Sequence, residues 1–354
     1  MTKAPENKGP DRTADRPFIS IIVPAYNEAA HLGGLLQDIA RQDYDPSSYE
    51  VLIADGGSQD RTREIAREFA AGKSSIQVID NPGRYVPSGL NLAIGQARGQ
   101  VIIRMDAHSR YPQNYLSALS GWLEKLKADN VGGVWNTLPA DGSAKARAIA
   151  LALAHPLGVG NALFRIGSAK VREVDTVPFG CYPKRVFEQI GLFDEQLWRN
   201  QDDEFNARLK KAGGKIFLIP EVKIDYYARG DFSRLAKMYY QYGYFKPLVN
   251  SKLGLPANLR QLAPASLILL PLILAGMAWW HPGFAWMAAG VLGFYLLAVA
   301  AVSAAVSAGS GPELFPYLTV SFLAIHFSYG WGYLRGIRDF TILKKLPRSL
   351  TSNR

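Results

Sequence analysis

Cysteine is almost absent from this chain, since Cys181 is the only one in 354 residues. A single cysteine excludes an internal disulfide framework and fits a reducing compartment. Acidic residues are also outnumbered, because 30 Asp and Glu stand against 40 Lys and Arg. This surplus favours an anionic partner: nucleic acid, a phosphorylated substrate or an acidic membrane surface. The basic residues form no recognisable nucleic-acid reading motif, so no nucleic-acid partner is expected.

Charge is missing from a long C-terminal stretch. Between Gln261 and Leu334, the only Asp, Glu, Lys or Arg is Glu313. Three apolar runs lie there, over 264–280, 284–308 and 314–334. A membrane-spanning helix needs about 20 apolar residues. The second run meets this easily and the third roughly, whereas the first is marginal and interrupted by Pro271. The sequence therefore predicts a transmembrane region of two or three helices at 264–336.

Basic residues flank this region on both sides. The positive-inside rule then requires both flanks in the cytoplasm and an even number of crossings. With three runs, either one is re-entrant or interfacial, or the rule is overruled, and the sequence leaves both open. Residues 1–16 do not resemble a signal peptide and are expected to form a flexible tail. We expect a bacterial-type inner membrane, with residues 17–230 and a basic tail at 337–354 on its cytoplasmic side.

Residues 17–230 are typical of an α/β domain. Short runs rich in β-branched residues alternate with helix-like segments, which indicates a mostly parallel sheet covered on both faces. The expected strands are 19–23, 51–54, 76–79 and 101–105, and the expected helices are 31–42, 62–71 and 88–97. Residues 231–263 mix basic and aromatic side chains directly before the apolar region. This mixture favours a membrane-interface segment over an ordinary amphipathic surface helix.

Polar residues follow three of the predicted strands. Glu28 comes after the first strand, Asp55 ends the second, and Asp106 and His108 follow the fourth. Ligands of open parallel sheets bind at the carboxyl ends of the strands, so these groups are expected to line one crevice. Their negative charges would repel each other without a cation or hydrogen bonds. Asp106 and His108 offer an oxygen and an imidazole nitrogen from one turn, which suits Mn²⁺ or a related ion such as Mg²⁺.

These motifs resemble those of glycosyltransferase family 2. The matching segments are Val23-Pro-Ala-Tyr-Asn-Glu28, Ala54-Asp-Gly-Gly-Ser58, Asn91 with Gly99, Asp106-Ala-His108, Phe193-Asp-Glu195 and Gln201–Leu209, and together they span residues 18–246. Within the family, the Asp-Ala-His-Ser segment, the loop Val177–Tyr182 and the apolar tail resemble the succinoglycan-pathway glucosyltransferase type. The resemblance implies a GT-A fold and a nucleotide-diphosphate sugar donor, usually a UDP-sugar.

The resemblance also implies roles for individual residues. Asp202 would be the catalytic base, and Asp106 and His108 would hold the metal. The expected nucleotide-binding residues are Pro24, Ala25, Tyr26, Glu28, Asp55, Arg84, Asn91 and Asp106. The expected acceptor-binding residues are Phe179, Gly180, Tyr182, Trp198 and Asp203, and those contacting a diphosphate or lipid phosphate are Arg208, Gln241 and Lys246.

The sequence departs from the family pattern at three points. The usual metal motif is Asp-x-Asp, so His108 replaces a carboxylate. Gln201 occupies an acidic position, which leaves Asp202 aligned with the catalytic Asp and Asp203 as a neighbouring competitor. The Gln-x-x-Arg-Trp motif of processive members is not intact after Gln241. This last departure favours one transfer per acceptor over polymerisation.

The leading hypothesis is a membrane-anchored, metal-dependent, inverting and non-processive glycosyltransferase. It would move a sugar, expected to be glucose, from a UDP-sugar to a hydroxyl of a polyprenyl-diphosphate-linked saccharide during exopolysaccharide assembly. Asp202, near a helix start, would act as the general base. Two alternatives stay open: transfer to a polyprenyl monophosphate, which needs no base, and a non-catalytic membrane scaffold that binds sugar nucleotides.

Overall fold

The computed structural model describes residues 16–254 and 259–345, which fall into two compact units. The first unit contains residues 16–136 and 167–226, and the second contains residues 137–166 and 227–345 without the undescribed gap. Residues 1–15 of the predicted tail and 346–354 of the predicted basic tail lie outside the described residues.

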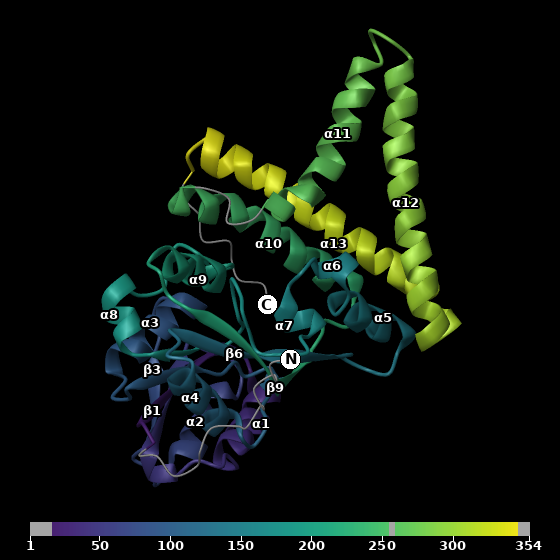
Figure 1. The fold of residues 1–354 in the computed structure, drawn as a ribbon. Helices are drawn as coiled ribbons and strands as arrows, with labels where there is room; N and C mark the ends of the chain where they lie inside the picture. The colour runs from purple at the N-terminus through teal and green to yellow at the C-terminus, as the bar shows by residue number, and fades with distance from the viewer. Residues whose placement is uncertain (1–15, 255–258, 346–354) are drawn as a thin grey trace, which may run out of the picture. The chain divides into compact units, whose positions relative to one another are not determined.

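The first unit is built on a mixed sheet with the strand order β3-β2-β1-β4-β8-β6-β9-β5 (Figure 1). Its N-terminal half is parallel, as predicted, and consists of β1 (Ile19–Ala25), β2 (Tyr49–Asp55), β3 (Ile76–Asp80) and β4 (Val101–Arg104). β1 and β2 are buried at every position, which explains their nearly continuous apolar sequences. The connecting helices are α1 (Ala29–Ala40), α2 (Thr62–Ala70) and α3 (Val86–Gln96). The expected α/β order is therefore confirmed.

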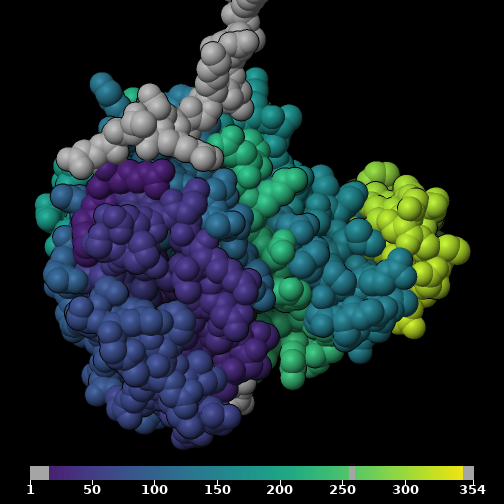
Figure 2. All heavy atoms as spheres, turned by 90° about the horizontal axis from the view of Figure 1, so that it is seen from below, coloured from purple at the N-terminus to yellow at the C-terminus, as the bar shows by residue number. Residues whose placement is uncertain are grey.

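The remaining strands bring antiparallel pairing that the sequence did not predict. β8 (Cys181–Pro183) runs antiparallel to β4 and to β6 (Asn130–Leu138), and β9 (Ile216–Tyr227) runs antiparallel to β5 (Ser109–Arg110) and β7 (Arg172–Glu173). Three further helices belong to this unit: α4 (Tyr115–Lys125), α8 (Arg185–Ile190) and α9 (Gln201–Lys211). Figure 2 shows the N-terminal segment, from purple to blue, forming one continuous face of the unit.

The second unit is helical. Its long elements are α10 (Phe232–Leu253), α11 (Ala263–Met277), α12 (Gly283–Ser310) and α13 (Phe315–Gly336), which a π-helical turn at Ile337–Ile342 extends. The shorter ones are α5 (Ala144–Leu153), α6 (Pro156–Val159) and α7 (Leu163–Ile166), with 3-10 turns at Leu259–Leu262 and Pro312–Leu314. Glu313, the single charge of the apolar region, is neutralised by Arg147 of α5 at 3.1 Å.

Two helices have the length and composition to cross a membrane. They are Arg260–Met277 and Gly283–Ser310, and only 22% and 11% of their apolar windows are buried within the protein. They form a hairpin (Figure 1). Its turn exposes Trp279 and Trp280 at 92% and 78%, as is typical of side chains at a membrane–water interface. Two crossings would return the chain to the side from which it came. The basic residues on both flanks would then lie on the same side, as the positive-inside rule requires.

The third apolar run, which by length roughly met the requirement for a span, behaves differently. It forms α13, which is not among the candidate spans in the described part of the chain. α13 instead packs closely on α10 through glycines. A Cβ atom at Gly332 would lie 2.2 Å from the carbonyl oxygen of Tyr240, and one at Gly243 would lie 2.0 Å from that of Tyr329. The two backbones therefore meet directly, because no side chain separates them.

This close approach predicts the effect of one added methyl group. Gly332→Ala places its Cβ against the α10 backbone, which cannot move aside as a flexible side chain can, and overpacking of this kind costs about 1–3 kcal/mol. We expect the thermal unfolding midpoint of the detergent-solubilised protein to fall by several degrees. Gly290→Ala on α12 is the matched control, because nothing lies within 4 Å of its added Cβ. Equal midpoints for the two variants would contradict the packing described here.

Candidate active site

The carboxyl ends of β1, β2 and β4 bring three acidic side chains to one edge of the sheet. Parallel register pairs Ala25 with Asp55, and Glu28 precedes α1 directly after β1. Asp106 follows β4 by two residues. Asp55, Asp106 and Glu28 are exposed by only 1%, 8% and 9%. Buried carboxylates need partners, and each has local ones.

Asp55 organises the loop after β2. Its carboxylate accepts hydrogen bonds from the hydroxyl of Ser58 at 2.6 Å and from the Ser58 backbone N–H at 3.3 Å. The Ser58 hydroxyl in turn accepts from the backbone N–H of Asn27 at 2.9 Å. The backbone N–H of Glu28 donates to Thr62 Oγ1 at 2.7 Å. These bonds fix the two loops that would face a nucleotide.

Arg104 is the centre of the site, and it was not among the residues predicted from sequence. Its guanidinium donates to both oxygens of Asp106, at 2.7 and 2.9 Å, and through its remaining terminal nitrogen to Asp202 at 2.6 Å. The Arg104 side chain is only 6% exposed. One buried cation therefore joins the acidic residue after β4 to the acidic residue that begins α9.

Asp202 occupies the first turn of α9, as the sequence predicted for a loop entering a helix. Its side chain is 32% exposed, so it can be reached from solvent while it remains bound to Arg104. Burial raises the pKa of Asp202 to about 6, against the opposing effect of Arg104 and with the charges of Asp106 and Asp203 adding to the rise. Because Arg104 is shared with Asp106, it only partly compensates Asp202. A carboxylate that titrates near neutral pH can accept a proton and release it.

His108 lies beside Glu28, with 3.8 Å between His108 Nδ1 and Glu28 Oε1. Among the described residues no group of three His, Cys, Asp or Glu side chains could hold a metal. Asp106 and His108 nevertheless fit an ion that is also bound by phosphate oxygens, since Mg²⁺ at such sites uses one or two protein ligands. Arg104 already donates to each Asp106 oxygen, so an ion bound there would share this carboxylate with Arg104.

Two of the predicted acceptor-binding rings are buried instead. Phe179 and Tyr182 are 5% and 3% exposed, and Tyr182 packs edge-on against Phe205. Neither ring can stack on a sugar in this arrangement. Gly180 also has a packing role, because a Cβ there would lie 2.4 Å from the Tyr182 ring, and its carbonyl accepts from the Arg104 N–H at 3.2 Å. The segment Phe179–Tyr182 is thus part of the packing around the Arg104 backbone.

Partly exposed aromatic side chains lie elsewhere in this unit. Trp198 stacks on Tyr85 with ring centroids 4.5 Å apart, and Trp135 stacks on Tyr226 at 4.1 Å. The Tyr226 ring is also 6.1 Å from the ring of His108. Trp198 was predicted to bind the acceptor, whereas Tyr85 and Tyr226 were not predicted from the sequence. The half-buried rings of Trp198, Tyr85 and Trp135 are suited to pack against sugar faces, whereas Tyr226 is only 4% exposed.

Of the remaining residues predicted to bind the nucleotide, some lie next to Asp55 and one does not. Tyr26 and the exposed Arg84 border Gly56, next to Asp55, since a Cβ at Gly56 would lie 3.4 Å from the Tyr26 ring and 3.1 Å from the Arg84 carbonyl oxygen. Pro24 and Ala25 are the last residues of β1. Asn91 is instead structural, because its amide bonds the backbone of Phe193 in both directions and the side chain of Glu195.

The predicted phosphate contacts need a similar correction. Arg208 makes four hydrogen bonds within the protein: two of 2.9 Å to Glu204 and one each to the carbonyl oxygens of Ile190 and Leu192. Gln241 and Lys246 lie on α10 in the second unit. Asp203, predicted to bind acceptor, is the half-buried neighbour of Asp202 on α9.

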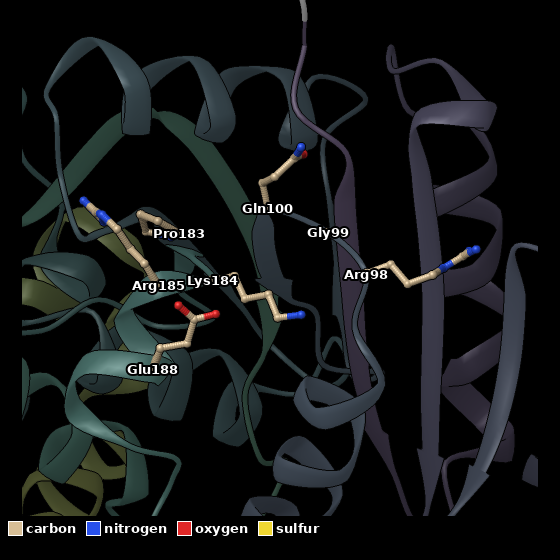
Figure 3. A pocket seen from close by; sticks show the side chains of 7 residues that line it. All are labelled: Arg98, Gly99, Gln100, Pro183, Lys184, Arg185 and Glu188. Carbon is tan, nitrogen blue, oxygen red and sulfur yellow. The ribbon is translucent and has the colours of Figure 1, made fainter.

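A pocket of about 370 Å³ lies at the opposite edge of the sheet, where β4 begins and β8 ends. Its lining residues are Arg98, Gly99, Gln100, Pro183, Lys184, Arg185 and Glu188 (Figure 3). Its cations are engaged, with Arg98 bound to Glu50, Lys184 to the Ala97 carbonyl and Arg185 to Asp129. It contains none of the acidic residues at the carboxyl edge, so the chemistry lies elsewhere.

Comparison with known proteins identifies relatives of this chain. The model of glycosyl transferase family 2 matches residues 20–178. The succinoglycan biosynthesis protein ExoA of Rhizobium meliloti is 29% identical over 322 residues, which is 90% of this chain and 95% of that protein. A dolichyl N-acetylglucosaminyl phosphate diacetamidodideoxyglucuronosyltransferase of Methanococcus voltae is 30% identical over 243 residues, covering 66% of this chain and 74% of that protein.

A solved structure supports the fold. The mannosyltransferase PcManGT of Pyrobaculum calidifontis, in complex with GDP-mannose and Mn²⁺, aligns with a TM-score of 0.60 and 21% identity over 93% of this chain and 91% of that one. This likeness confirms the predicted GT-A fold.

The Arg104 network predicts a large effect on stability. Arg104→Met leaves the buried Asp106 without its cation, and breaking a buried pair in this way costs about 3–5 kcal/mol. In the double variant Arg104→Met/Asp106→Asn the loss should be partly recovered, because only Asp202, whose side chain is 32% exposed, is then left without the cation. The measurement is the free energy of unfolding in urea. Arg61→Met is the control, since its pair with Glu64 is exposed and contributes at most about 1 kcal/mol. A loss at Arg104 no greater than at Arg61 would refute the network.

Proposed function

This chain belongs to glycosyltransferase family 2, and we propose that it transfers one sugar, with inversion, from a nucleotide-diphosphate donor to a hydroxyl group of a polyprenyl-diphosphate-linked saccharide. The observation that carries the proposal is the pairing of Asp202 with Arg104, which also binds Asp106. This pairing joins a proton acceptor to the side chains that would face the donor. UDP-glucose is the proposed donor, and exopolysaccharide assembly is the proposed setting.

The donor would lie along the carboxyl edge of the sheet. Asp55 and Glu28 would contact the base and ribose, and Arg84, beside Gly56, would face the phosphates. Asp106 and His108 are the side chains that would hold a Mn²⁺ or Mg²⁺ ion, which when bound supplies neutralisation of the diphosphate charge. The relative PcManGT was solved with GDP-mannose and Mn²⁺, which supports this part of the proposal.

Asp202 would perform the proton transfer. Its carboxylate takes the proton from the acceptor hydroxyl while that oxygen attacks the anomeric carbon. The bond from the anomeric carbon to the diphosphate breaks on the opposite face, and the diphosphate leaves with the bonding electrons. Arg104 orients Asp202 throughout, because two of its nitrogens are already fixed on Asp106.

The two candidate spans support a membrane location. A lipid-linked acceptor explains why a catalytic domain and a membrane hairpin occur in one chain. The Methanococcus voltae relative is named for a dolichyl phosphate-linked sugar, which supports an acceptor of this class. We further propose the cytoplasmic face of an inner membrane as the place of reaction, from the basic flanks of the hairpin.

The role of Asp202 predicts the behaviour of one variant. Asp202→Asn keeps the shape of the side chain but cannot accept a proton, so turnover should fall by about 10²–10⁴-fold. Donor binding, measured by calorimetry with UDP-glucose, should change little. The assay is nucleotide release from a panel of sugar donors with a lipid-linked acceptor, with and without Mn²⁺ or Mg²⁺. Asp175→Asn, at an exposed carboxylate, is the control. Near-normal turnover by Asp202→Asn would favour transfer to a polyprenyl monophosphate, whose nucleophile is already anionic.

The pKa of Asp202 predicts the pH dependence. A general base works only when ionised, so kcat/KM should fall about tenfold per pH unit below about 6 and level off above it. Asp203→Asn removes a like charge that raises the pKa of Asp202, and it should shift the acid limb to lower pH. The measurement is the pH profile of kcat/KM for both proteins. An acid limb that Asp203→Asn leaves in place would assign it to another group.

A further inference from the structure

The C-terminal end of α13 presents a surface of unusual composition. We call it the basic–apolar face. Its apolar members Trp331, Ile342 and Leu343 are 55%, 68% and 51% exposed. Its cationic members are Arg335, Arg338, Lys344 and Lys345, all exposed. These residues lie on the end of α13, on the π-helical turn and on the three residues after it. Exposed apolar side chains mixed with cations are typical of segments lying at a membrane interface.

The buried carboxylate of Asp339 pairs with two of these cations, Arg338 and Lys345. Asp339 is 5% exposed and accepts two hydrogen bonds from Arg338, at 3.0 and 2.9 Å. Lys345 approaches the same oxygen at 3.5 Å, and the Tyr244 hydroxyl of α10 donates to the other oxygen at 3.1 Å. Residues 335–345 contain four cations and this single carboxylate, so the face keeps a positive charge. Asp339 therefore positions the cations without neutralising them.

The position of this face relative to the hairpin is fixed within the second unit. α11 begins where it crosses α13, because a Cβ at Gly330 would lie 2.2 Å from the carbonyl oxygen of Pro264. Arg338 lies eight residues beyond Gly330, about 12 Å along the helix. Figure 1 shows α13 running across the foot of the α11–α12 hairpin. A helix that crosses the foot of a membrane hairpin lies at the level of the lipid headgroups.

From these observations we propose that the basic–apolar face docks on the bilayer surface, with Arg335, Arg338 and Lys345 binding the phosphate groups of anionic phospholipids. The guanidinium groups offer paired N–H donors to phosphate oxygens. Trp331, Ile342 and Leu343 enter the adjoining acyl region. The face is spread over four turns and lies open, which suits ordinary phospholipids better than a single carrier lipid. α13 is on this view an interfacial helix, and the hairpin alone crosses the membrane.

The test uses the full-length protein in vesicles. Cys181 is fully buried, so Ile342→Cys provides a single reactive thiol for a fluorescent label on the face. Brominated phosphatidylglycerol, titrated into phosphatidylcholine vesicles, should quench the label at lower mole fraction than brominated phosphatidylcholine. Removing one arginine, by Arg335→Gln or Arg338→Gln in this background, should weaken the preference about fivefold, the equivalent of ~1 kcal/mol. Added salt should weaken it further.

The controls separate docking from general effects of charge and folding. Arg61→Gln/Arg67→Gln removes two exposed cations of the first unit and should leave the quenching curve unchanged. Arg335→Gln keeps the Asp339 pairs intact, so it remains informative if Arg338→Gln folds poorly. A label that bromine on either lipid fails to quench would overturn the proposal. Displacement of phosphatidylglycerol by equimolar polyprenyl phosphate would also overturn it, because the face would then be a carrier-lipid site.

Discussion

The site depends on one buried guanidinium that serves two carboxylates. Arg104 holds Asp106 with two bonds and Asp202 with a third, and each carboxylate therefore receives only part of its compensation. Removing one member of this largely buried group would leave a charge without its partner, which is unfavourable. Burial raises the pKa of Asp202, and Arg104 opposes this rise only in part. Under the proposed function, structural stability and proton transfer would therefore depend on the same contact.

The parallel half of the sheet and its helices followed from sequence because burial on both faces produces uninterrupted apolar runs. Asp55, Asp106 and Glu28 followed from the rule that parallel strands end at a common edge. The antiparallel strands did not follow, because β5, β7 and β8 are two or three residues long and carry no periodic pattern. Arg104 was missed because it ends an apolar strand, and its partner Asp202 lies 98 residues further along the chain.

The aromatic side chains predicted to bind the acceptor differ in their exposure. A ring next to a catalytic segment can face either the ligand or the core, and sequence spacing does not distinguish the two. Phe179 and Tyr182 face the core and support Arg104, whereas Tyr85 and Trp198 form a half-exposed stack. The third apolar run shows the same limit, since its length suggested a membrane span and its glycines instead serve packing on α10.

The glycine contacts between α10 and α13 have a mechanical consequence. Where two helices touch backbone to backbone, no rotamers are available to absorb a displacement, and sliding of one helix past the other is blocked by carbonyl groups. We therefore expect α10 and α13 to move together as one rigid unit. A displacement of α13 would therefore move α10 with it, and α10 begins at Phe232.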